Sequence, residues 1–233
     1  METVGSAIVL LLALDTATPA VTVAVHDGSR VLASRTTVDA RRHGELLAPL
    51  LAEAMAEAQA EPRDITDIAV GVGPGPFTGL RVGLVTARTT ASVVEAAVHG
   101  VCSLDIIAAA VSSDMPFVVA TDARRHEVHW ATYDGAGRRA DGPAVDRPAE
   151  LAARLAPDVP VVGRGAAVYA DELARAAPPL DGPLDPDAAV LARVVIEQRV
   201  ELLAVEPLYL RRPDAQVPGP MKPVVSQHRR RRR

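Results

Sequence analysis

Short apolar runs in the first forty positions predict three strands. The runs span Ile8 to Leu14, Ala20 to His26 and Val31 to Thr36, and Asp15 follows the first of them. Asp27-Gly28 lies between the second and third runs. Asp-Gly in this setting is a strong hairpin signal, because both central residues of a type I′ turn need positive φ. We therefore expect a buried strand followed by a hairpin.

The same arrangement recurs in the second half of the chain, which indicates an internal duplication. The run Phe117 to Thr121 ends at Asp122, the run Glu127 to Tyr133 follows, and Asp134-Gly135 then turns the chain. In both units the Asp-Gly pair follows the strand-end aspartate by twelve positions. Two copies of one strand-and-hairpin unit predict two similar sheets.

After each hairpin the apolar residues take the spacing of helices. In the first half we expect a helix from about His43 to Ala60, a strand from Ile68 to Val72 and, beyond a glycine-rich turn, a helix from about Thr78 to Val98. The second half is expected to have helices near Pro148 to Leu155, Ala166 to Ala176 and Asp187 to Arg199, with a strand from Val159 to Val162. The order predicts an α/β fold of duplicated mixed sheets with packed helices.

With 233 residues and 48% hydrophobic content, the chain can bury a core and hold two halves of roughly 100 residues each. We expect these halves at residues 1–104 and 105–212. Residues 213–233 have no apolar periodicity and are expected to form a disordered basic tail.

Charge is distributed unevenly between the body and the tail. The last 23 residues, Arg211 to Arg233, carry eight Lys/Arg and one Asp, so the net charge of −4 divides into about −11 for residues 1–210 and about +7 for residues 211–233. Phosphate contacts need cations, so any RNA contact falls to the tail, at Arg229 to Arg233, or to a partner protein.

The expected location is the cytoplasm, with no membrane partner. The apolar run Ala7 to Leu14 is eight residues long, whereas a membrane span needs ~20. Cys102 is the single cysteine and cannot form an internal disulfide, which fits a reducing compartment.

The helix from Thr78 is apolar around most of its circumference. Its charged residues, Arg81, Arg88 and Glu95, recur every seven positions and form one narrow stripe. Such a helix is covered on more than one side, and a sheet covers only one. The rest of its surface is interpreted either as buried under the helix His43 to Ala60 or as a protein interface. The interface candidates are Leu84, Ala87, Arg88, Ala91, Val94, Leu47 and Leu51.

The glycine-rich turn Gly71 to Gly83 does not match the nucleotide-binding fingerprints. It lacks the third glycine of the dinucleotide motif, and no Gly-Lys-Ser/Thr follows as in a P-loop. Pro74 and Pro76 also remove two amides that a phosphate would use. We expect a stiff structural turn at a helix start, formed by Gly73, Gly75, Phe77, Thr78, Gly79 and Arg81.

The residues predict no catalytic group, metal or cofactor. In His126-Glu127-Val128-His129 one residue follows the glutamate where a zinc protease has two, and on a strand the two rings point to opposite faces. The sequence contains no Gly-x-Ser-x-Gly, and Cys102 has apolar neighbours.

Several stretches, in order along residues 7 to 212, resemble the TsaB family of bacterial actin-like-fold proteins. The most specific stretch is the glycine turn with Phe77-Thr78-Gly79-Leu80-Arg81, and the others include Leu12 to Thr18, Asp122 to Arg124 and Val205 to Arg211. The resemblance implies the fold of the actin, Hsp70 and sugar-kinase superfamily. Pro76 stands where the family commonly has serine, which removes any hydroxyl contact made there.

In that superfamily the strand-end carboxylates and turns of both halves face a nucleotide, and the matching positions here are Asp15, Thr16 and Asp122. The alternative is that the two aspartates only satisfy backbone groups at the strand ends. Catalytic relatives carry two histidines four apart after the first hairpin. This chain retains only His43 there, which implies that it cannot hold the catalytic metal.

The resemblance implies a non-catalytic paralogue of the transferase TsaD. Such a protein supports transfer of threonylcarbamoyl from its AMP adduct to the adenosine beside the tRNA anticodon, with TsaE as a further ATPase partner. Alone, the chain is expected to form a homodimer. Three alternatives stay open: a stand-alone kinase-like ATPase of the same superfamily, a peptidase and an acyltransferase.

Overall fold

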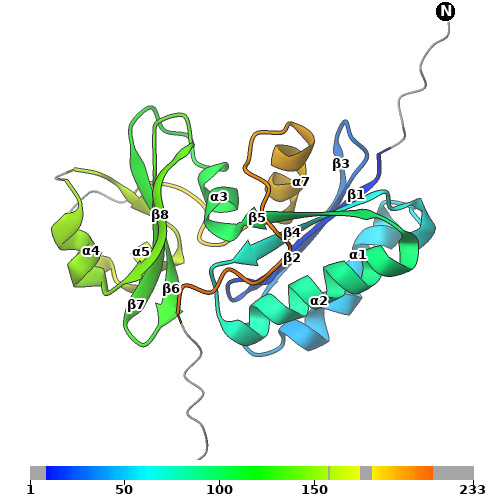
Figure 1. The fold of residues 1–233 in the computed structure, drawn as a ribbon, viewed down its shortest axis with the longest axis horizontal. Coiled ribbons are helices and arrows are strands. Elements are labelled where there is room, and N and C mark those ends of the chain that lie inside the picture. The colour runs from blue at the N-terminus through cyan, green and yellow to red at the C-terminus, as the bar shows by residue number, and fades with distance from the viewer. Residues whose placement is uncertain (1–8, 157, 174–179, 212–233) are drawn as a thin grey trace, which may run out of the picture.

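Two mixed sheets organise the computed structural model, which describes residues 9–156, 158–173 and 180–211 (Figure 1). The first sheet has the order β3-β2-β1-β4-β5, with bounds Val31–Val38, Ala20–His26, Leu11–Asp15, Asp67–Gly73 and Ala97–Cys102. The second has the order β8-β7-β6-β9, with bounds Arg139–Asp146, Glu127–Tyr133, Phe117–Arg124 and Val161–Val162. The expected tail, residues 213–233 with Arg229 to Arg233, lies outside the described residues.

Both sheets share one pairing scheme, which confirms the expected duplication. β1 pairs antiparallel with β2 and parallel with β4, and β6 pairs antiparallel with β7 and parallel with β9. β3 and β8 continue the two hairpins at an outer edge. Asp15 ends β1 and Asp122 lies near the end of β6, so the two aspartates occupy related places in the two halves.

The hairpins are present, but their turns differ from the expected two-residue type. Asp27 Oδ1 accepts hydrogen bonds from the amides of Ser29 and Arg30, and the positive φ in this turn belongs to Gly28. In the second hairpin the Asp134 carboxylate accepts from the amides of Ala136 and Arg138. Each aspartate therefore shapes a longer turn with its side chain.

Helices cover both faces of the first sheet, so its central strand is apolar throughout. The helices α1 (His43–Glu57) and α2 (Phe77–Val94) cover one face, and α7 (Ala188–Ile196) covers the other (Figure 1). Leu12 and Leu14 of β1 join the core under α1 and α2, whereas Leu11 and Ala13 join the core under α7. Burial on both faces explains why β1 is a continuous apolar run.

A short helix, α3 (Ser103–Ala108), connects the two halves and contacts strands of both sheets. Beyond it, α4 (Pro148–Arg154), α5 (Arg164–Val168) and α6 (Ala170–Leu173) accompany the second sheet, and a 3₁₀ turn, η1 (Pro62–Asp64), precedes β4. Among the described helices, none combines the length and the apolar character needed to cross a bilayer.

Three elements differ from the sequence expectations. α2 ends at Val94, and Glu95, which follows it, adopts left-handed φ of 60°. Ala97 and Val98, which were expected to lie in the helix, belong to β5. β8 was not expected. α7 was assigned to the second half by its position in the chain, but it packs on the first sheet.

After α7 the chain returns along the seam between the two halves; residues 201–211 are called the strap. The Leu203 amide donates to the Gly100 carbonyl at 2.8 Å, and the Leu208 amide donates to the Val72 carbonyl at 2.8 Å. A Cβ at Gly100 would lie 2.8 Å from the Leu203 carbonyl oxygen, so only glycine permits this approach. The strap thus closes one edge of the first sheet at β5.

Candidate functional site

The cleft candidate Asp15 is fully buried and has partners within the chain. Its Oδ2 accepts from the Ser103 hydroxyl at 2.6 Å and its Oδ1 accepts from the Ala17 amide at 2.8 Å. Burial raises the pKa of the Asp15 carboxyl to about 6, although the Ser103 hydrogen bond opposes this shift. The backbone of Gly71 lies against the carboxylate and leaves no room for a Cβ. Asp15 therefore joins β1 to α3, a contact whose second residue, Ser103, the sequence did not reveal.

Thr16 holds the start of α2 against the end of β1. Its hydroxyl donates to the Gly79 carbonyl at 2.8 Å and accepts from the Gly83 amide at 3.1 Å. A Cβ at Gly79 would lie 2.6 Å from the Thr16 carbonyl oxygen, and one at Gly83 would lie 2.5 Å from Thr16 Oγ1. The glycines at these helical positions permit this close packing.

The glycine-rich turn is packed against the chain's own backbone. Gly73 has φ of 98°, and its amide donates to the Ser103 hydroxyl at 3.2 Å. A Cβ at Gly75 would lie 2.2 Å from the Ala17 carbonyl oxygen. The turn thus places Phe77 and Arg81 at an exposed helix start while its glycines face inward.

Asp122 stabilises its own turn, and no hydrogen bond in the described part of the chain joins it to Asp15. Its Oδ1 accepts from the Arg124 amide at 2.9 Å and from the Tyr169 hydroxyl at 3.1 Å. Arg124, Arg125 and His126 all have positive φ, an arrangement that side chains normally disfavour. The carboxylate and Tyr169 help to hold this turn.

The two histidines of the His126-Glu127-Val128-His129 stretch lie in different surroundings. His126 is exposed and its Nε2 lies 3.0 Å from a carboxylate oxygen of Glu172. His129 is buried, and burial lowers the pKa of its imidazole to about 4. Across residues 9–156, 158–173 and 180–211, no three His, Cys, Asp or Glu side chains are grouped to hold a metal ion.

A small pocket of about 230 Å³ lies where the two halves meet. His43 lines it, with Nε2 at 2.7 Å from the Thr18 carbonyl oxygen, and so do Arg41, Thr78 and, from the second half, Arg124. The retained histidine is thus engaged with the chain's own backbone.

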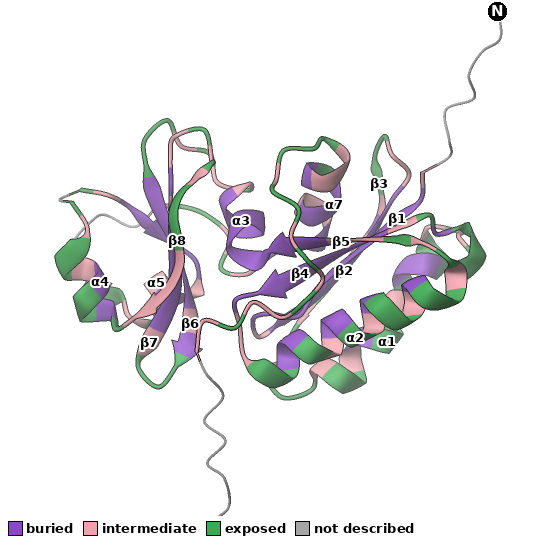
Figure 2. Cartoon of the chain, viewed as in Figure 1, coloured by how far each residue is buried: buried purple, intermediate pink, exposed green. Residues whose placement is uncertain are grey.

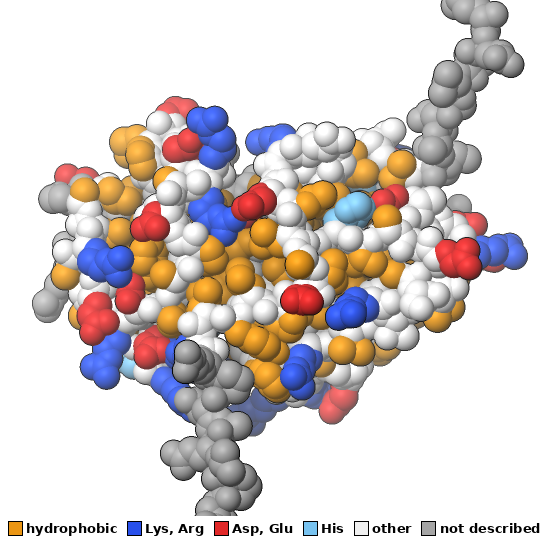
Figure 3. All heavy atoms as spheres, in the orientation of Figure 1, with side chains coloured by type: hydrophobic (Ala, Val, Ile, Leu, Met, Phe, Trp, Pro, Cys, Tyr) orange, Lys and Arg blue, Asp and Glu red, His pale blue; other side chains and the backbone are white. Residues whose placement is uncertain are grey.

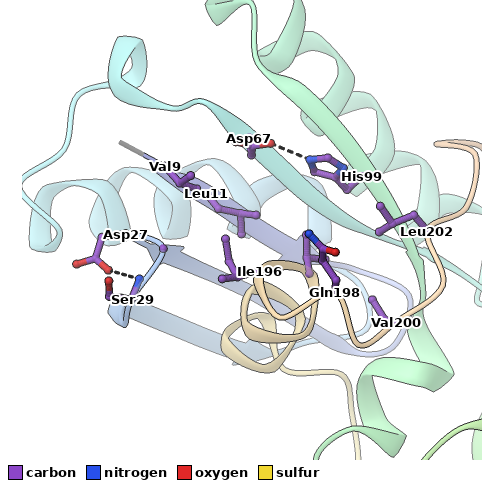
Figure 4. A pocket seen from close by; sticks show the side chains of 12 residues that line it. Val9, Leu11, Asp27, Ser29, Asp67, His99, Ile196, Gln198, Val200 and Leu202 are labelled. Atoms are coloured by element: carbon purple, nitrogen blue, oxygen red, sulfur yellow. Dashed lines mark hydrogen bonds and ion pairs between the residues drawn. The ribbon is translucent and has the colours of Figure 1, made fainter. Parts of the chain in front are cut away.

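A larger pocket, of about 760 Å³, lies beside α7, at the ends of β1 and β4 where these strands begin (Figure 4). Leu11 and Ile196 point into it, and at one side His99 Nε2 lies 2.8 Å from Asp67 Oδ1 (Figure 4). The pair sits on the sheet face that α7, ending at Ile196, leaves uncovered.

The structure corrects the expected interface residues on α1 and α2. Leu84 is 3% exposed and Leu47 is 2% exposed, and Ala87 and Ala91 are also buried in the core beneath the two helices. The apolar stripe that was interpreted as a candidate interface is the stripe that packs on the sheet. Arg88 is exposed, and Leu51 and Val94 are half-buried.

The outer side of α2 carries a different set of apolar and basic side chains, which we call the outer face. Phe77 is 45%, Val85 61% and Val93 76% exposed. Arg81 and Arg88 lie among them, and within the described ranges neither arginine forms an ion pair with a carboxylate. Figure 2 shows the buried side of α2 turned toward the sheet and its exposed side turned away. Phe77, Arg81 and Arg88 were named from the sequence, whereas Val85 and Val93 were not.

The neighbouring helix α1 presents acidic residues. Arg35 of β3 lies 3.9 Å from a carboxylate oxygen of Glu53 and also pairs with Glu57. Glu45 is exposed in the first turn of α1. The apolar and basic side chains on the outside of α2 thus lie beside a helix whose carboxylates Glu53 and Glu57 pair with Arg35.

Two mixed sheets of one duplicated topology, with helices packed on them and strand-end aspartates in related places, define an actin-like α/β protein. Residues 30–180 match the family model described as TsaD, tRNA N6-adenosine threonylcarbamoyltransferase. The chain belongs to the TsaB family, which confirms the resemblance found in the sequence.

Solved structures agree with this assignment. A Pseudomonas aeruginosa protein described as similar to peptidase YeaZ superposes with a TM-score of 0.74 at 31% identity, covering 88% of this chain and 100% of that one. YeaZ from the same organism gives a TM-score of 0.70 at 30% identity, covering 87% of this chain and 100% of that one.

Curated relatives differ in how much of their length the chain spans. A Mycobacterium leprae protein is 41% identical over 93% of this chain but only 59% of its own length. A Mycobacterium tuberculosis protein is 43% identical over 88% of this chain and 93% of its own. The Escherichia coli tRNA threonylcarbamoyladenosine biosynthesis protein TsaB is 33% identical over 53% of this chain and 54% of its own length. Of these three relatives, the Escherichia coli protein is the one whose name refers to tRNA threonylcarbamoyladenosine biosynthesis.

Proposed function

We propose that the protein is a non-catalytic subunit in tRNA threonylcarbamoyladenosine biosynthesis, and that it binds a TsaD-type transferase. Membership of the TsaB family supports the pathway. The outer face of α2 supports the proposed binding of a partner, because Val85 and Val93 are among the most exposed apolar side chains of the described residues. Exposed apolar residues gathered on one helix are typical of an interaction surface.

The transferase catalyses the reaction, in which threonylcarbamoyl is transferred from its AMP adduct to the adenosine beside the anticodon. This chain's own strand-end groups serve its fold: Asp15 and Thr16 hold α3 and α2 in place. Because these buried groups hold the fold together, we expect the subunit to act through its surface, by stabilising the transferase in its active conformation.

The charge of the outer face indicates which residues the partner contributes to the interface. Arg81 and Arg88 flank Val85 without carboxylate partners in the described part of the chain. We expect a transferase helix with apolar residues and carboxylates to lie against them, since complementary charge directs docking. In the absence of the transferase the same surface makes a homodimer. A TsaE-type ATPase joins the complex, and tRNA is bound through the complex or through Arg229 to Arg233.

A reconstituted modification assay tests this function. The transferase, threonylcarbamoyl-AMP and unmodified tRNA are incubated with and without this chain, and modified adenosine is measured by mass spectrometry. We expect modification to depend on the chain and to survive Asp15→Asn, which keeps the buried position filled. Full modification without the chain would contradict the proposal. ATP hydrolysis by the chain alone, lost in Asp15→Asn, would favour the kinase-like alternative.

A further inference from the structure

Phe77, Arg81 and Tyr209 form an exposed cluster at the start of α2, which we call the stack. The rings of Phe77 and Tyr209 lie 5.4 Å apart at an interplanar angle of 20°. The Arg81 guanidinium carbon lies 3.9 Å from the centroid of the Phe77 ring, and Arg81 Nε donates to the Tyr209 hydroxyl at 3.4 Å. Two segments separated by more than a hundred residues thus build one surface feature.

The exposure of the stack is unusual for this chain, which has only six aromatic residues in total. Phe77 is 45% and Tyr209 38% exposed, whereas Phe117, Trp130 and Tyr133 are buried. Ordered, exposed aromatic rings beside an arginine are typical of the residues that dominate binding energy at interfaces. Figure 3 shows hydrophobic side chains gathered along the seam and at the start of α2, with basic side chains beside them.

The strap that carries Tyr209 is fixed to both halves. Leu203 and Leu208 pack against the cores of the first and the second half. At its ends, Glu201 pairs with Arg139 at 2.6 Å and Arg211 pairs with Glu127, both residues of the second half. The position of Tyr209 on α2 therefore depends on contacts that cross the seam.

We propose that the strap is part of the partner-binding surface, with the stack as its anchor. The occupant is the TsaD-type transferase, so the inference rests on the proposed function. The transferase contributes a carboxylate to Arg81, flanked by apolar side chains that cover Phe77 and Tyr209. Arg81 has no carboxylate partner in the described chain, and a guanidinium held in place by rings can donate two parallel hydrogen bonds to a carboxylate.

In this arrangement the transferase contacts the strap, which lies along the seam, as well as α2. Once the transferase covers Tyr209, residues 203–208 can separate from the first sheet only if the partner contact also breaks. The amides of Leu203 and Leu208 donate to Gly100 and Val72, so their exchange with solvent reports this separation.

The affinity for the transferase tests the inference with three variants. We expect Tyr209→Ala to weaken binding by about 10- to 100-fold. Tyr209→Phe keeps the ring and should bind within about threefold of the wild type. The control is Val168→Ala in α5, a residue that is 54% exposed and belongs to the second half. Unchanged affinity in a folded Tyr209→Ala protein would overturn the inference.

Hydrogen exchange on the wild-type chain provides a test that does not depend on a variant folding. Saturating transferase should slow exchange of the Leu203 and Leu208 amides, and unchanged exchange at both would overturn the inference. A wild-type chain that does not bind the transferase would instead refute the proposed function itself. The two failures are therefore distinguishable.

Discussion

The Thr16 hydroxyl donates a 2.8 Å hydrogen bond to the carbonyl of Gly79, which is 63 residues away in the chain. This bond fixes the start of α2 against the end of β1. The outer face and the stack both begin at this helix start, so the geometry of the surface depends on a buried hydroxyl.

Replacing Thr16 by valine keeps the shape of the side chain but removes the hydroxyl. The buried Gly79 carbonyl and Gly83 amide would both lose a partner, and we expect the free energy of unfolding to fall by about 1–3 kcal/mol. Chemical denaturation measures this change. Thr89→Val on the exposed side of α2 is the matched control, and equal stability of the two variants would show that the Thr16 hydrogen bonds contribute nothing.

Gly83→Ala and Gly44→Ala should have opposite effects although both glycines are helical. Alanine is favoured over glycine in a helix by about 1 kcal/mol. A Cβ at Gly44 meets nothing within 4 Å, so this variant should be more stable than the wild type. At Gly83 the Cβ would lie 2.5 Å from Thr16 Oγ1, and we expect a loss of stability. Thermal unfolding compares the two, and a stabilised Gly83→Ala protein would contradict the packing described.

Asp15 should make the protein less stable as pH rises from about 4 to 6. Its pKa is about 6 in the folded chain against an ordinary 3.8, so the folded state holds the proton more tightly than the unfolded state. The bound proton stabilises the folded state fully below pH 4, and this stabilisation is lost as pH rises through 6. The resulting decrease in the free energy of unfolding is at most about 3 kcal/mol. Asp15→Asn should remove this part of the pH dependence, measured as unfolding free energy against pH. An identical profile for the variant would assign the dependence to other groups.

Arg88→Ala should weaken the salt dependence of transferase binding and leave stability within about 0.5 kcal/mol, because Arg88 is exposed. The dissociation constant is measured at low and high salt. Arg30→Ala, at the β2–β3 turn, removes another exposed charge, away from α2, and should leave the salt dependence unchanged. Equal salt slopes for Arg88→Ala and wild type would argue against a carboxylate opposite Arg88.

Elements with local signals were predictable from the sequence. The hairpins followed from alternation and from Asp27 and Asp134, although the type of turn depended on side-chain hydrogen bonds. β5 was missed because its apolar residues continue those of α2, and Glu95, rather than a glycine, ends the helix. β8 was missed because Gly142 and Pro143 interrupt a strand in which every residue is exposed or half-buried.

The surface was harder to predict than the fold. Apolar residues around α2 indicated two covered sides but not which stripe faces the sheet, so buried Leu84 was taken for an interface residue while exposed Val85 was overlooked. The contact between Phe77 and Tyr209 depends on the path of the strap, and no local pattern encodes such a long-range contact. The buried, hydrogen-bonded environment of Asp15 was likewise not predictable, because its partner Ser103 is distant in the sequence.

Light scattering of the chain mixed with the TsaD-type transferase tests the central claim most directly, with Val85→Glu as the variant. Val85 is 61% exposed, so the substitution should leave the fold intact while placing a buried charge in the proposed interface. We predict a mixed complex for the wild type and separate species for Val85→Glu. A complex that forms equally well with the folded variant would contradict the assignment of the outer face of α2 as the partner-binding surface.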